Sequence, residues 1–248
     1  MGVTGRDISA AVVGPCLCSA EMLRAVLFDV DFTLSRPGPE LGPDAYRRVG
    51  DTHGLSLDPE RYEEARVAAF ADLRTHPELV HDEEIWIVFT EDIVRGMGGD
   101  AEGSRACAVE IVRRWEVHAN FDLYDDAVPV LDALRAYGLR IGLISNGQRD
   151  LDAFARHHEL DVDVAVGSKS HGRTKPHASI FETALASLGV GAGETVMVGD
   201  SYADDIEGAR ALGMRAILLD REGLYPDESD RIGGLGTLPS ALGLPVRS

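Results

Sequence analysis

Five short apolar runs, each ending at a polar or small residue, constrain the fold of this chain most. They lie at residues 23–28, 140–144, 162–166, 195–199 and 215–219. Stretches with helical periodicity precede or separate the last four, at residues 127–137, 151–157, 178–188 and 204–212. Short strands that are apolar along their length and alternate with helices are typical of a parallel sheet covered on both faces. We therefore predict an α/β fold with a Rossmann-like parallel-sheet core.

Residues 36–121 interrupt this alternation. No convincing strand is found there, and helical periodicity recurs at residues 43–54, 59–75, 83–97 and 103–118. The sequence therefore predicts a core formed by residues 22–35 and 122–248, with a mostly α-helical module inserted at 36–121. The insertion follows the carboxyl end of the first strand, where open parallel sheets bind ligands. Residues 1–21 are expected to form a disordered extension, not a signal peptide.

The charge balance narrows the possible partners. The chain has 24 Lys and Arg residues against 42 Asp and Glu, a formal charge of −18. Such a surface repels nucleic acids and anionic membranes, although one small phosphate can still bind locally. No run is long enough to span a membrane. Three cysteines are too few for a disulfide framework, which favours a cytoplasmic location. The oligomeric state, monomer or homodimer, stays open.

Two carboxylates, Asp29 and Asp31, follow the first strand two residues apart. At the end of a buried strand their charges repel each other and resist burial unless a cation lies between them. A single Asp there would be read most simply as a helix cap. The pair, followed by Thr33, instead indicates a cation site.

Other polar residues follow later strands or precede helices. Ser145, Asn146 and Gly147 follow the second predicted strand, where a hydroxyl and backbone N–H groups can hold a phosphate oxygen. Lys175 precedes Pro176 at the start of a helix and suits a phosphoryl group. Each of these features alone is also common in a turn or on a surface.

Acidic residues follow the fourth strand as well. Asp200 stands at its end, and Asp204 and Asp205 follow four and five residues later. Acids in the first turn of a helix are common because they complement its dipole, so Asp204 and Asp205 also have a purely structural interpretation. Excess carboxylates with one lysine and one hydroxyl at a single sheet edge describe phosphoryl transfer with Mg²⁺.

In this order the motifs resemble those of the haloacid dehalogenase-like (HAD) hydrolases. The resemblance rests on Asp29-Val30-Asp31-Phe32-Thr33, Ser145, Lys175 and Gly199-Asp200 with Asp205, and it covers residues 22 to about 225. The helical insertion resembles the helical cap of that family. Phe32 departs from the pattern, because many members carry glycine at this position.

The resemblance implies a Mg²⁺-dependent phosphatase that acts on a small phosphate monoester. Asp29 would be the nucleophile that forms an aspartyl-phosphate, and Asp31 the general acid and base. The residues implied to hold Mg²⁺ are Asp29, Asp31 through its carbonyl, Asp200 and Asp205. Those implied to bind the substrate phosphate are Thr33, Ser145, Asn146 and Lys175, and Lys175 is also implied to be catalytic. Asp205 fits the last motif better than Asp204.

Several alternatives stay open. A 2-haloacid dehalogenase, a phosphonatase and a sugar-phosphate mutase use similar motifs, and a catalytically idle interaction protein or a signalling receiver belongs to another functional class. Within the insertion, Trp86 and Trp115 are interpreted as core-packing residues in preference to substrate-stacking ones. His53 and Arg66 are further candidates to face the site.

Overall fold

A six-stranded parallel sheet forms the core of the computed structural model, which describes residues 23–73 and 76–245. The strand order is β5-β4-β1-β6-β7-β8. The strands are β1 (Ala25–Phe28), β4 (Arg140–Ser145), β5 (Val164–Gly167), β6 (Thr195–Gly199), β7 (Arg215–Leu219) and β8 (Arg231–Ile232). The α/β class and the five predicted strands are confirmed. The sixth was not predicted, because β8 has only two residues and shows no pattern. The predicted extension at 1–21 lies outside the described residues.

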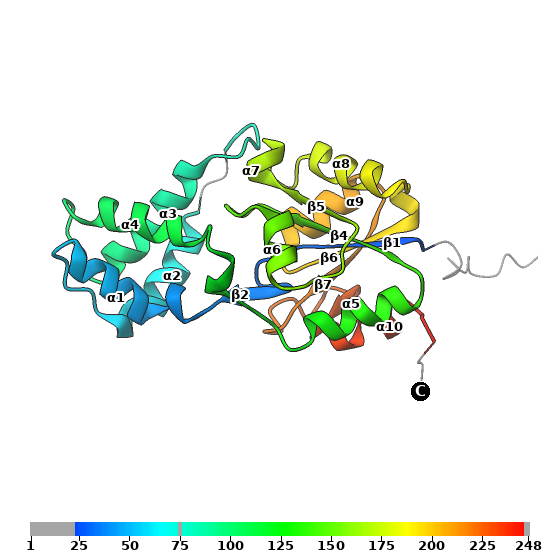
Figure 1. Cartoon of the computed structure of the whole chain (residues 1–248), viewed down its shortest axis with the longest axis horizontal. Coiled ribbons are helices and arrows are strands. Elements are labelled where there is room, and N and C mark those ends of the chain that lie inside the picture. The colour runs from blue at the N-terminus through cyan, green and yellow to red at the C-terminus, as the bar shows by residue number, and fades with distance from the viewer. Residues whose placement is uncertain (1–22, 74–75, 246–248) are drawn as a thin grey trace, which may run out of the picture.

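Helices cover both faces of the sheet (Figure 1). One face packs against α5 (Ala127–Ala136), α6 (Leu151–His157) and α10 (Leu238–Ala241), and the other against α8 (Ala178–Leu188) and α9 (Gly208–Ala211). In β1, Val26 and Phe28 contribute to the first cluster and Ala25 and Leu27 to the second. Successive strand residues point to opposite faces, so a strand between two helical layers must be apolar throughout.

Four helices form a separate bundle, here called the helical module (residues 43–115). They are α1 (Pro43–Thr52), α2 (Tyr62–Ala71), α3 (Glu83–Gly96) and α4 (Ser104–Arg114). All four predicted helices are therefore present, and each ends before the residue at which the sequence predicted its end. Asp82 caps α3 by accepting a hydrogen bond from the Glu84 amide at 3.0 Å. The module has its own apolar cluster and lies beside the sheet in Figure 1.

Two short strands join the module to the core. β2 (Ser35–Pro37) and β3 (Phe121–Leu123) pair in antiparallel orientation, so the chain leaves and re-enters the core side by side. The prediction that residues 36–121 contain no strand is therefore wrong at both ends. Strands of three residues are too short to show alternation. Among residues 23–73 and 76–245, no helix combines the length and the apolar character needed to cross a membrane.

Candidate active site

The carboxyl ends of three neighbouring strands bring the predicted residues together. β1 lies between β4 and β6, so Asp29, Ser145 and Asp200 meet at one edge of the sheet. A cavity of about 580 Å³ opens over this edge. The polar residues here called the floor of the cavity are Asp29, Asp31, Ser145, Asn146, Gln148, Arg149, Lys175, Asp200 and Asp204.

Lys175 is the buried cation of the floor. Its side chain is 2% exposed, and its Nζ lies 2.5 Å from Asp29 Oδ1 and 2.6 Å from Asp205 Oδ1. Burial alone would lower the pKa of Lys175, but the two carboxylates outweigh burial and raise this pKa above its usual value. The lysine therefore stays charged and fixes both acids in place.

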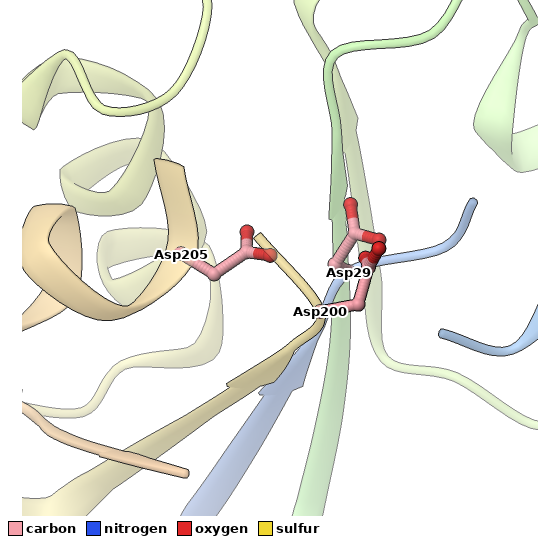
Figure 2. Close-up of side chains that lie close together, drawn as sticks. All are labelled: Asp29, Asp200 and Asp205. Atoms are coloured by element: carbon pink, nitrogen blue, oxygen red, sulfur yellow. The ribbon is translucent and has the colours of Figure 1, made fainter. Parts of the chain in front are cut away.

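Asp29, Asp200 and Asp205 form a tight group of carboxylates. One oxygen of each lies within 4.8 Å of the others, and Figure 2 shows Asp205 directed toward the two strand ends. Burial raises the pKa of Asp29 and of Asp200 to about 7 and that of Asp205 to about 6, with neighbouring acids adding to each shift. One lysine does not balance three acids, of which Asp29 and Asp205 are buried and Asp200 is half-buried. Clustered hard oxygen donors with excess negative charge fit a divalent cation such as Mg²⁺.

Local backbone chemistry explains why Asp205 reaches this group. It lies in a π-helical turn, Tyr202–Glu207, and its Oδ2 accepts a hydrogen bond from the Ser201 amide at 3.1 Å. A Cβ on Gly199 would lie 2.1 Å from that same oxygen, so only glycine leaves room for the carboxylate. Such turns inside helices are often found at functional sites. Asp204 instead lies near Asn146 Nδ2, at 3.3 Å, so the structure places Asp205 and not Asp204 in the group.

The other predicted residues hold the floor together through hydrogen bonds. Thr33 is buried and donates to Asp200 Oδ1 at 3.2 Å, and it is not among the residues that line the cavity. Asn146 accepts from the Lys175 amide at 2.7 Å and donates to the Lys175 carbonyl at 3.0 Å. Ser145 Oγ lies 3.4 Å from Asp31 Oδ2. Thr33 and Asn146 therefore orient Asp200 and Lys175, while their predicted contacts with phosphate stay predictions.

Two floor residues were not predicted from the sequence. Arg149 forms an ion pair with Asp31, and its guanidinium carbon lies 3.6 Å from the ring centre of Phe121 and 5.0 Å from that of Phe154. A cation between two aromatic faces is stabilised even where it is desolvated. Gln148 is buried, and neither atom of its amide has a hydrogen-bond partner within the described residues. Their only sequence signal is a position three and four residues after Ser145.

Comparisons with known proteins decide the family. The model of the haloacid dehalogenase-like hydrolases matches residues 23–213. The chain belongs to this family. It is similar to the glyceraldehyde 3-phosphate phosphatase of Methanopyrus kandleri, with 31% identity over 85% of this chain and 89% of that protein.

Among solved structures, a HAD phosphatase of Thermococcus onnurineus has 26% identity and a TM-score of 0.63, covering 89% of this chain and 98% of that one. A 2-haloacid dehalogenase of Pseudomonas syringae pv. tomato has 25% identity, the same coverage and a TM-score of 0.59. The HAD hydrolase family thus includes relatives of this chain with different chemistries, and the site must decide between them.

Proposed function

We propose that this HAD hydrolase is a Mg²⁺-dependent phosphatase that cleaves a small phosphate monoester through an aspartyl-phosphate on Asp29. The observation that carries this proposal is the floor of the cavity, where Asp29 lies beside a buried lysine and within a group of three acids. Similarity to two proteins named as phosphatases supports it. Bound at Asp29, Asp200, Asp205 and the Asp31 carbonyl, Mg²⁺ would screen the negative charge that opposes contact between a carboxylate and a phosphate.

In the first step, a carboxylate oxygen of Asp29 attacks the phosphorus atom, and the bond between phosphorus and the ester oxygen breaks. Asp31 gives a proton to the departing alkoxide, which leaves as the alcohol. Lys175 stabilises the phosphoryl oxygens, as does Ser145. Arg149 stabilises the carboxylate that Asp31 becomes after it has lost its proton.

In the second step, Asp31 takes a proton from a water molecule, whose oxygen attacks the phosphorus atom. Inorganic phosphate leaves, and the Asp29 carboxylate is regenerated. The same residue thus serves as acid and then as base, which restores its starting protonation at the end of each turnover.

We further propose that residues 36–121 act as a cap over a core of residues 22–35 and 122–248. The separate apolar cluster of the helical module and its two-strand connection, β2 and β3, support this division. A cap that closes over the floor would exclude water from the reaction.

Hydrolysis of p-nitrophenyl phosphate with Mg²⁺ and with EDTA tests the proposed reaction. We expect turnover only with the metal, and no release of halide from 2-chloropropionate or cleavage of phosphonoacetaldehyde. Halide release without phosphatase activity would overturn the proposal.

A 2-haloacid dehalogenase is the second candidate, because one similar structure has that name and the cavity above Asp29 is lined by many apolar residues. Displacement of halide from carbon needs neither a cation nor an acid for the leaving group. Asp31 and Asp200 would then have no part in the reaction. The complete group of acids therefore favours the phosphatase.

A further inference from the structure

Aromatic residues are concentrated around one cavity. Both tryptophans of the chain, four of its seven phenylalanines and two of its six tyrosines line it. We call these residues the aromatic wall: Phe32, Tyr46, Tyr62, Phe70, Trp86, Phe89, Trp115 and Phe121. Six of the eight come from the helical module, opposite the polar floor.

The rings of the wall contact one another. Trp86 and Trp115 have ring centres 5.6 Å apart, and Phe89 meets both edge-on. Phe70 continues the contact at 4.7 Å from Phe89 and reaches Phe32 at 6.3 Å. Phe32 stands between Asp31 and Thr33 in the first motif, so the wall extends to the edge of the floor. Trp86 and Trp115 thus pack in the module, as predicted, and also line the cavity, which the sequence did not indicate.

Phe32 has an unfavourable backbone conformation. Its φ is +61°, in the left-handed region that side chains other than glycine rarely adopt. Strain of this kind persists where the surrounding structure enforces it, and it is frequent at functional sites. A glycine would relieve the strain but would remove the ring that contacts Phe70. Since glycine would form the same turn without strain, the conformation indicates that the ring of Phe32 has a role beyond the turn.

The charged groups among the wall's neighbours are already paired. Glu63 and Arg66 are the only charged residues of the module, within its described part, that line the cavity. Arg66 binds both carboxylate oxygens of Glu63, at 2.5 and 3.0 Å, and lies over the ring of Phe70. His53, the other candidate from this region, pairs with Glu110 and does not line the cavity. The module therefore offers little to recognise a second charge on a substrate.

The size of the cavity adds a second constraint. A volume of about 580 Å³ lies within the range of sites that enclose drug-sized ligands. A three-carbon ester with free hydroxyl groups would leave most of this space to water, and its hydroxyls would face rings that cannot satisfy them. An apolar body of one or two rings would fill the space and displace that water.

We propose that the substrate is a phosphate monoester of an alcohol with an uncharged aromatic body. This inference rests on the phosphatase function proposed above. The phosphate lies on the floor at Asp29, and the aromatic body lies against the wall between Phe32 and the two tryptophans.

A series of esters with similar leaving groups tests the preference. Ethyl phosphate, 2-phenylethyl phosphate and glycerol 3-phosphate all release primary alcohols, so bond cleavage is chemically similar in the three. Differences in kcat/KM therefore reflect how the enzyme binds the organic part of each ester. We expect 2-phenylethyl phosphate to exceed the other two by about tenfold or more. Equal values, or a preference for glycerol 3-phosphate, would overturn the inference. Absence of all phosphatase activity would instead contradict the proposed function.

Tryptophan fluorescence tests the inference independently of turnover. Both tryptophans line the cavity, so ligand-induced changes in emission come from this site. In the Asp29→Asn variant, we expect 2-phenylethyl phosphate to change the emission saturably, with a Kd at least about tenfold below that of ethyl phosphate. Equal Kd values would mean that the wall does not contact the body, which contradicts the inference even if the enzyme is inactive.

Phe32→Gly tests the part of the wall nearest the floor. Glycine accepts the left-handed backbone, so this variant is expected to fold. A selective role predicts that the ratio of kcat/KM for 2-phenylethyl phosphate to that for ethyl phosphate falls. A purely structural role would change both values equally. Val88→Ala, on a residue of α3 that is 43% exposed and does not line the cavity, is the matched control and should leave the ratio unchanged.

Discussion

The floor and the aromatic wall face the same cavity, but different forces hold them. On the floor, charge and hydrogen bonds fix Lys175 against Asp29 and against Asp205, which is buried and does not itself line the cavity. On the wall, rings from α2, from α3 and from Trp115, just after α4, contact one another with no hydrogen bond or ion pair between them. Removal of one member of a buried charged network is strongly destabilising, because its partner is left as an unpaired buried charge. Apolar surfaces, in contrast, tolerate replacement of a side chain by one of similar shape. We therefore expect changes on the floor to affect the reaction rate and changes on the wall to affect substrate choice.

The largest effect is expected on the floor, from Asp29→Asn. An amide is a poor nucleophile, so the kcat for p-nitrophenyl phosphate should fall by about four orders of magnitude or more. Steady-state kinetics with enough enzyme to detect residual turnover provide the measurement. Asp44→Asn, on an exposed residue of α1, is the matched control and should retain full activity.

Removal of the metal should also reduce activity to background, and its effect on stability should depend on pH. Burial raises the pKa of Asp29 and Asp200 from 3.8 to about 7, so these carboxyls hold protons more tightly in the folded state. The stability of the metal-free protein should therefore fall as pH rises from about 4 to about 7. Mg²⁺ at about 100 times its Kd should then raise Tm by about 5–10 °C at pH 8, and by less at pH 5.5.

Thermal unfolding with and without Mg²⁺ at the two pH values measures this difference. The Asp200→Asn variant should lose most of the increase at pH 8. An equal increase in Tm at both pH values would mean that the cation binds outside this group of acids.

Gly199→Ala tests how closely the floor is packed. The added methyl group would lie 2.1 Å from Asp205 Oδ2, so the carboxylate must move away from Lys175. A displacement of this size should lower kcat/KM by about a hundredfold. Gly193→Ala is the matched control, since a Cβ there meets no atom within 4 Å. Comparable activity of the two variants would show that the position of Asp205 is not critical.

Arg149→Met should have a smaller effect that depends on the leaving group. Without the guanidinium, the charged form of Asp31 loses its partner, so proton transfer to the alcohol should slow. We expect kcat to fall about tenfold for an alkyl ester, and by less for p-nitrophenyl phosphate, whose leaving group needs little protonation. The control is Arg156→Met, on an exposed residue of α6. A uniform loss for both substrates would point to damaged packing around Phe121 and Phe154.

The smallest effect is expected on the wall, from Trp86→Phe. This change retains an apolar ring but removes part of the contact surface, so it should raise KM for 2-phenylethyl phosphate about threefold and change kcat less. Comparison of KM and kcat for this variant with those of Val88→Ala provides the measurement. A fall in kcat with no change in KM would contradict the division between floor and wall.

The difference between the floor and the aromatic wall also explains which site residues could be predicted from the sequence. Acids, a lysine and a hydroxyl at the ends of buried strands are conspicuous, because such residues are costly to place there without a function. Asp29, Asp200 and Lys175 could therefore be expected at one edge of the sheet. The strand order brings Asp29 and Asp200 together there, and Lys175 joins them through its ion pair with Asp29. Aromatic residues at helical spacing carry no such signal, because packing alone accounts for them. Trp86 and Trp115 look like core residues until the cavity is seen.

Arg149 and the strand pair β2–β3 were missed for a related reason. The place of Arg149 in the site depends on its contact with Phe121, which lies 28 positions earlier in the sequence. Only tertiary packing brings the two residues together. β2 and β3 have three residues each, too few for a pattern, and they are stabilised by pairing with each other. Features defined by contacts between distant segments cannot be read from local periodicity.

Acid quenching of the enzyme during turnover tests the central claim most directly. With Mg²⁺ and saturating substrate, mass spectrometry of the quenched and digested protein should find one phosphoryl group on the peptide that contains Asp29. The Asp29→Asn variant should carry none. Steady turnover without any phosphorylated peptide, or phosphorylation at another residue, would contradict the assignment of Asp29 as the nucleophile.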